Sequence, residues 1–170
     1  MRPVARKGLR TIGAAVAALA AAAPACAAPV ATVSAQIVRP LELTWVQDLD
    51  LGTITLGPGT WSGATVAISK TAVFSCTNAN VTCTGATKPA QYKLVGTNKQ
   101  MIYINAPNVT LVNQRDPTKT LTLKVDSPGS VTLTNSGQPG STFSLGGSIT
   151  LSSTTPDGVY SGTFNVTVDY

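Results

Sequence analysis

Alternation of apolar and polar side chains is the feature that most restricts the folds this sequence can adopt. It is clearest from Val159 to Tyr170, where every second residue from Phe164 onward is apolar or aromatic. Neighbouring side chains of a β-strand point to opposite faces, so a period of two fits a strand with one buried face. Thr and Val, which suit strands better than helices, are abundant. The sequence predicts an all-β protein.

Short segments of the same kind recur along the chain, and turn residues separate them. A strand from Leu41 to Trp45 is expected to follow Pro40, and Gly52 predicts a kink in the segment Leu49 to Ile54. Further strands are expected at residues 65–69, 72–76, 92–95, 101–104, 109–112, 120–125, 131–134 and 148–152. Such spacing predicts a single immunoglobulin-like antiparallel β-sandwich. Tyr160, just after Asp157-Gly158, also resembles the tyrosine corner of these sandwiches.

Residues 1–27 have the composition of a secretory signal peptide. Four basic residues precede an uncharged, Ala-rich run from Ile12 to Ala23, and Ala25-Cys26-Ala27 matches a signal-peptidase site. The run is too short to anchor the chain, since crossing a bilayer takes about 20 residues. We expect a helical signal peptide at 1–27 and a β-sandwich domain at 28–170, exported to the periplasm, cell surface or medium without a transmembrane anchor. Acylation of Cys26 is the alternative that would keep a lipid anchor.

Loss of this segment changes the charge and the cysteine count. The whole chain has 12 basic and seven acidic residues, a net charge of +5. Four of the basic residues lie in residues 1–27, which leaves eight against seven, a net charge of +1. The positive charge is therefore no indication of nucleic-acid binding. Cys76 and Cys83 remain, and an even pair in an exported protein indicates a disulfide.

The sequence offers little catalytic or metal-binding chemistry. It contains no histidine, the commonest general base and zinc ligand. Asp48 and Asp50 would share one face of a strand, as a calcium site or an acid/base pair would require. Calcium needs six to eight oxygen ligands, and Glu42 is the only other acidic residue nearby. We interpret the two aspartates as a solvated face and expect no catalytic residue, no cofactor and no metal, so the protein is not expected to be an enzyme.

Aromatic residues offer a second kind of candidate site. Flat rings with a polar edge can stack on sugars, and the candidates are Trp45, Trp61, Tyr92, Tyr103 and Phe143. Trp61 lies in the Gly-rich loop 57–63 and is the first choice for a ligand contact. The alternative is that these rings belong to the core or to half-buried sheet positions.

Two motifs resemble those of a known protein family. The first spans Ala35–Leu43 and leads into Asp48–Ile54, and the second is Gly158–Tyr170. Together they resemble the domain of unknown function 4402 (DUF4402) family of small exported bacterial proteins. More distantly, they resemble chaperone–usher pilins of the spore-coat-U type. The resemblance implies a pilin-like sandwich without catalytic residues.

The resemblance also implies a function, as a subunit of a bacterial fimbrium, surface fibre or layer. In such assemblies the N-terminal segment of one subunit completes the sheet of its neighbour. The candidate donor residues are Ala31, Val33, Ala35 and Ile37, and the candidate receiving residues are Phe164, Val166, Val168 and Tyr170. The partners would be other copies or related subunits, a periplasmic chaperone and an outer-membrane usher. The donor period also fits an ordinary first strand of the same molecule, so both readings stay open.

A different class of function, a self-contained carbohydrate- or surface-binding module, is the alternative. In that reading Trp61 and its loop make the contact, and no neighbouring subunit is needed.

Overall fold

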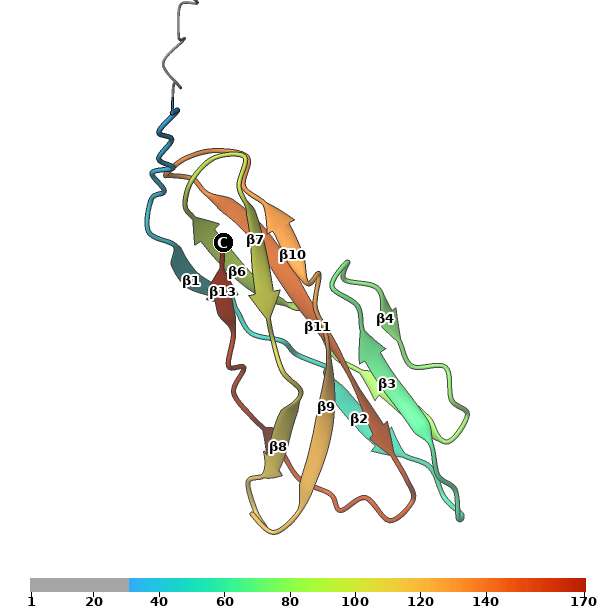
Figure 1. Cartoon of the computed structure of the whole chain (residues 1–170). Helices are drawn as coiled ribbons and strands as arrows, with labels where there is room; N and C mark the ends of the chain where they lie inside the picture. Colours follow the sequence, from blue (N-terminus) through green and yellow to red (C-terminus); the bar gives the residue numbers. More distant parts are fainter. Residues whose placement is uncertain (1–30) are drawn as a thin grey trace, which may run out of the picture. The chain divides into compact units, whose positions relative to one another are not determined.

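The computed structural model describes residues 31–170, which contain strands but no helix (Figure 1). Residues 31–41 belong to no strand, and Gln36–Tyr170 form one compact unit. The signal peptide predicted at 1–27 lies outside the described residues. Within the described part of the chain, no helix is long and apolar enough to cross a membrane. The strands are β1 (Glu42–Gln47), β2 (Thr53–Leu56), β3 (Ala64–Ile68), β4 (Phe74–Ser75), β5 (Val81–Thr84), β6 (Ala90–Val95), β7 (Met101–Asn105), β8 (Val109–Asn113), β9 (Thr120–Asp126), β10 (Ser130–Thr132), β11 (Ser141–Leu151), β12 (Tyr160–Ser161) and β13 (Thr167–Asp169).

The strands pair into antiparallel sheets, which confirms the all-β sandwich predicted from the alternation. The largest sheet has the order β1-β6-β11-β9-β8-β12, and β3 joins it by pairing with both β11 and β4. The second sheet has the order β10-β7-β13, and the third consists of β2 and β5. Figure 1 shows β11 extending from the neighbourhood of β6 to that of β3. This one long strand therefore belongs to both halves of the sandwich.

One hydrophobic core lies between the β6 and β11 side of the large sheet and the β7 sheet. Its buried members include Leu94, Ile102 and Leu145, and the rings of Tyr92 and Phe143 stack with centroids 5.5 Å apart. Burial, and secondarily the charge of Asp48, raises the pKa of the Tyr92 phenol. Both rings are therefore core residues.

A second core lies where β3, β8, β9 and the end of β11 face β2 and β5. Its buried members include Val66, Leu123 and Ile149. Cys76 and Cys83 form a disulfide that packs against this core, which confirms the predicted pairing.

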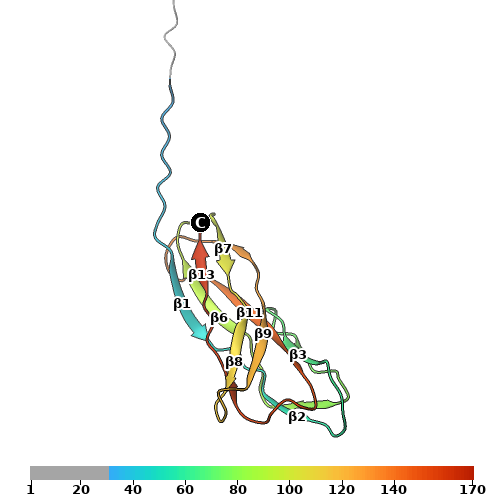
Figure 2. The same cartoon turned by 60° about the horizontal axis from the view of Figure 1, so that its bottom comes forward.

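The long strand predicted from Val159 to Tyr170 is divided into β12 and β13. β12 pairs with β8. β13 pairs with β7 and lies beside it in Figure 2. From Tyr160 to Thr167 is seven residues, whereas their partners Asn113 and Asn105 are eight residues apart, so the register shifts by one. Pro107, in the segment between β7 and β8, has no N–H to donate to a ladder. The prediction of one continuous strand is therefore wrong, because pairing stops opposite this segment.

Two local predictions around the divided strand hold. From Phe164 to Tyr170 the even-numbered side chains are half-buried and the odd-numbered ones are exposed, as the alternation predicted. The Tyr160 hydroxyl donates a 2.9 Å hydrogen bond to the Pro156 carbonyl, the geometry of a tyrosine corner.

Candidate functional site

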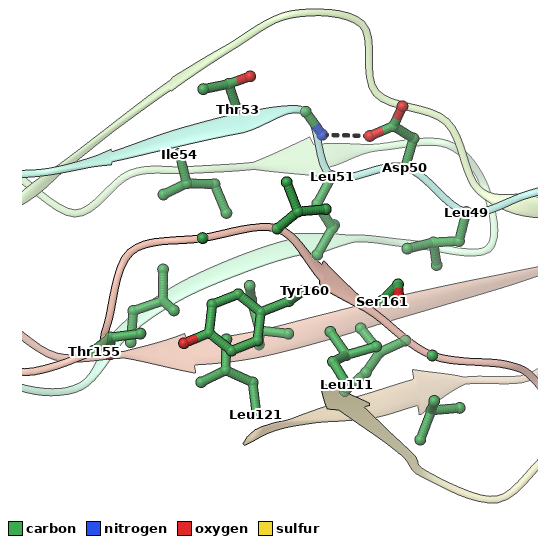
Figure 3. A pocket seen from close by; sticks show the side chains of 18 of the residues that line it. Leu49, Asp50, Leu51, Thr53, Ile54, Leu111, Leu121, Thr155, Tyr160 and Ser161 are labelled. Carbon is green, nitrogen blue, oxygen red and sulfur yellow. Dashed lines mark hydrogen bonds between the residues drawn. The ribbon is translucent and has the colours of Figure 1, made fainter. Parts of the chain in front are cut away.

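A groove of about 1120 Å3 opens between β2 and the segment that contains β12 (Figure 3). Its lining is apolar over β2, β8, β9 and β11, and polar side chains lie among the remaining residues. The apolar lining residues include Leu49, Leu51, Ile54, Leu56, Val109, Leu111, Leu121, Leu123, Ile149, Leu151, Val159 and Phe164. Several of them also belong to the second core, so the groove exposes part of that core to water.

The two walls of the groove are strand edges without partners among residues 31–170. β2 pairs on one side with β5 and on its other side with no described strand. β12 is the last strand of the large sheet, and residues 162–166 after it belong to no strand. Unpaired edges present free N–H and C=O groups to any extended chain that enters between them. The groove therefore has the form of a missing strand position.

The walls run in opposite directions. In Figure 3 the chain passes from Asp50 through Thr53 to Ile54 on one wall, and from Thr155 through Tyr160 to Ser161 on the other, the opposite way. A strand inserted between them would be parallel to one wall and antiparallel to the other. Both ladder types form stable sheets.

The β2 wall begins at a kink that the sequence predicted. Gly52 has a φ of 72°, a left-handed conformation that favours glycine, and its N–H donates to the Asp50 carboxylate at 2.8 Å. Asp50 also pairs through its backbone with Lys88. This turn places Leu49 and Leu51 against the groove.

The opposite wall is held by Asn113, the one buried polar side chain of the described residues, with 1% of its surface exposed. Its Nδ2 donates to the Asp157 carbonyl at 2.9 Å, and its Oδ1 accepts from the Arg115 N–H at 2.9 Å. A Cβ at Gly158, where φ is 141°, would lie 2.5 Å from this Nδ2. Only glycine at position 158 therefore allows the chain to pass so close to the Asn113 side chain.

The predicted acidic pair lies at the mouth of the groove and is occupied by local hydrogen bonds. Asp48 accepts from the Trp45 indole N–H at 3.0 Å, while Asp50 caps Gly52. Among residues 31–170 no group of three or more His, Cys, Asp or Glu side chains could hold a metal. These bonds orient the β1–β2 connection, and the aspartates form no cluster with another acidic residue.

The predicted receiving residues do not all face the groove. Phe164 lines it, whereas Val166, Val168 and Tyr170 pack against the first core. The predicted donor residues Ala31, Val33, Ala35 and Ile37 are exposed and belong to no strand.

The aromatic candidates separate into buried and exposed rings. Trp61, the first choice for a ligand contact, is half-buried against the second core, and its indole N–H donates to the Gly57 carbonyl at 3.1 Å. Tyr92 and Phe143 are core residues, while Trp45 and Tyr103 are 59% and 60% exposed. The structure therefore leaves more ring surface available at Trp45 and Tyr103 than at Trp61.

The sequence reasoning missed most of the groove. Leu111, Leu121 and Ile149 lie on expected strands. Their sequence neighbourhoods do not show whether such a side chain is buried in a core or faces a position where a strand is missing. A signal that could reveal the groove is an excess of apolar residues: more inward-facing apolar side chains than the expected strands can bury.

Comparison with known proteins gives one match. The model of a family described as Domain of unknown function (DUF4402) matches residues 41–170, which include every strand and the whole groove. No curated protein and no solved structure matches this chain. The match covers most of the sequence. It includes Asp48–Ile54 and the whole second motif, Gly158–Tyr170, and begins within the Ala35–Leu43 part of the first motif. The chain therefore belongs to the DUF4402 family.

Proposed function

We propose that this protein is a non-enzymatic structural subunit of an exported bacterial fibre or layer, assembled by β-strand complementation. The observation that carries the proposal is the apolar groove between the unpaired edges of β2 and the β12 segment. A strand placed there would bond to backbone groups and cover apolar side chains in one step. We assign this position to residues 31–37 of a neighbouring copy.

The donor assignment rests on pattern, exposure and length. Ala31, Val33, Ala35 and Ile37 present apolar groups at alternate positions, and Val33 and Ile37 are 95% and 92% exposed. The seven residues 31–37 match the eight-residue wall Leu49–Leu56 in length, about 20–25 Å when extended. One face of the segment would enter the groove, while Thr32, Ser34 and Gln36 would face water.

The other proposed partners, a chaperone and an usher, follow from the open state of the groove before assembly. Open apolar edges template aggregation, so the free subunit needs a temporary cover. A periplasmic chaperone that lends a strand would provide it, and an outer-membrane usher would receive the subunit. We therefore propose that the protein passes through the periplasm and assembles at the cell surface.

The test compares the exported form, residues 28–170, with the same form lacking residues 28–38, by sedimentation velocity and electron microscopy. The exported form should assemble into regular fibres, and the truncated form should form none. A synthetic peptide of residues 28–38 should then bind the truncated form with one-to-one stoichiometry. Regular fibres of the truncated form, an exported form that does not assemble, or a peptide that does not bind would each contradict the proposal.

A pair of charge variants separates strand insertion from a general effect of charge. Val33→Asp with Ile37→Asp places two carboxylates on the face expected to enter the groove. Thr32→Asp with Gln36→Asp adds the same charge to the opposite face. Assembly should be lost only in the first variant, because burying an unpaired carboxylate is costly. Equal loss in both variants would count against the proposed insertion.

A further inference from the structure

A second surface feature, which shares no lining residue with the groove, lies on the β10-β7-β13 sheet. Tyr103, in the central strand β7, is largely exposed. Its direct cross-strand neighbours are Ser130 of β10 and Asp169 of β13. Directly paired residues project from the same face of a sheet, with Cβ atoms about 4.5–5.5 Å apart. A hydroxyl, a phenol ring and a carboxylate therefore form a row across this face.

The row borders a shallow depression of about 440 Å3. Asn105, Gly129, Thr167 and Asp169 contribute to its lining together with Tyr103. Asn105 pairs with Thr167 next along the same face, so an amide and a second hydroxyl lie beside the first row. No atom lies within 4 Å of a Cβ built on Gly129, so the space beside it is open.

The groups in this depression match the chemistry of a sugar. A phenol ring offers a flat apolar face to the C–H groups of a pyranose and keeps a polar edge. The Asp169 carboxylate is oriented by a 2.9 Å hydrogen bond from the Tyr170 N–H to Oδ1, which leaves Oδ2 to accept from a ligand hydroxyl. The Asn105 amide can both donate and accept. The lining contains a carboxylate and no basic residue, so an anionic ligand is disfavoured.

We propose that the outer face of β7 and β13 binds a neutral sugar unit of a glycan. Tyr103 stacks on the ring, and Asp169 and Asn105 bind its hydroxyls. The proposal goes beyond assembly, because it gives the protein a contact with a glycosylated surface. It does not depend on donor-strand insertion, since none of these residues lines the groove.

The test is an array of neutral glycans probed with the labelled full-length protein, followed by calorimetric titration with the strongest binder. Binding should be weak, and Tyr103→Ala should weaken it at least tenfold. Asp169→Asn should weaken it severalfold, while Tyr103→Phe, which keeps the ring, should retain most of it. No binding to any neutral glycan, or unchanged binding by Tyr103→Ala, would overturn the proposal.

Val73→Ala serves as a matched surface control, because Val73 is also an exposed apolar residue but lies outside this face. Its binding should equal that of the unmodified protein. Circular dichroism of each variant should match as well, which excludes loss of binding through unfolding. Self-association through Tyr103 in place of glycan binding would identify the face as a subunit contact and reject the sugar site.

Discussion

The phenol hydroxyl of Tyr170 donates a hydrogen bond to the backbone carbonyl of Arg39, 131 residues earlier in the chain. The same oxygen accepts from the Thr97 N–H at 3.1 Å, and the Arg39 N–H donates to Thr97 Oγ1 at 2.7 Å. Three segments that are distant in sequence therefore meet at one hydroxyl. The contact holds the backbone just before β1 against the connection between β6 and β7.

Replacing this hydroxyl is expected to destabilise the domain. Tyr170→Phe removes the donor to Arg39 and the acceptor for Thr97, and should lower the free energy of unfolding by about 1–2 kcal/mol. Urea unfolding followed by circular dichroism measures the change. Tyr103→Phe, which removes an exposed hydroxyl, is the control and should have no effect. Equal stability of both variants would show that the Tyr170 contact contributes nothing.

Asn113 should be a strong determinant of stability for the β12 wall. Asn113→Ala leaves the Asp157 carbonyl and the Arg115 N–H without their partner and should cost about 2–3 kcal/mol. Asn113→Asp keeps the shape and the acceptor oxygen but loses the Nδ2 donor. Thermal unfolding should rank the two below the unmodified protein. Hydrogen exchange should rise first at Tyr160 and Ser161, and uniform exchange across all strands would contradict a local role.

The disulfide should stabilise the loop that joins β4 and β5. Replacing both cysteines by serine, at Cys76 and Cys83, should lower the free energy of unfolding by about 2–3 kcal/mol, as expected for a short closed loop. Denaturant titration in the absence of reductant measures the loss. Adding reductant to the unmodified protein should reproduce it, and reductant should not affect the serine variant.

Acid should weaken the link between Lys70 and Asp126. Hydrogen bonds from the Lys70 ammonium, at 2.8 Å, and from its backbone N–H lower the pKa of the Asp126 carboxyl from 3.8. A lowered folded-state pKa means that the stabilisation is complete above pH 3.8 and is lost as pH falls through the folded value.

The half-exposed ion pair of Lys70 and Asp126 should contribute about 0.5 kcal/mol to the free energy of unfolding, because solvent screens it. Asp126→Asn should therefore be less stable than the unmodified protein at pH 6, and the difference should shrink as the pH falls below 3.8. Asp157→Asn, at the more exposed pair with Arg115, is the control and should change nothing measurable. A constant difference across this pH range would refute the ionic contribution.

The sequence predicts the strands well where one face is apolar and the other polar. β3, β7 and β9 lie within one or two residues of their expected positions, because side-chain period alone defines them. β11 begins seven residues before the expected Ser148. Its first half, Ser141–Leu145, alternates as well, but Gly146 and Gly147 interrupt the pattern before Ser148.

The groove could not be predicted, because it depends on which strands are neighbours. The alternation shows that Phe164 and Val168 face inward, but not that Phe164 also lines the groove whereas Val168 does not. The division between them follows from the register shift around Pro107, which is a property of pairing between distant segments. The Gly-rich loop predicts an exposed Trp61, but tertiary packing against the second core half-buries it.

The open edges beside β2 and β12 have a thermodynamic consequence for the purified protein. Any extended segment that occupies the groove binds the folded state and not the unfolded chain, so mass action adds its binding free energy to the folding free energy. Under the proposed assembly, the melting temperature should therefore rise with protein concentration. A stability measured for that assembly would refer to one stated concentration.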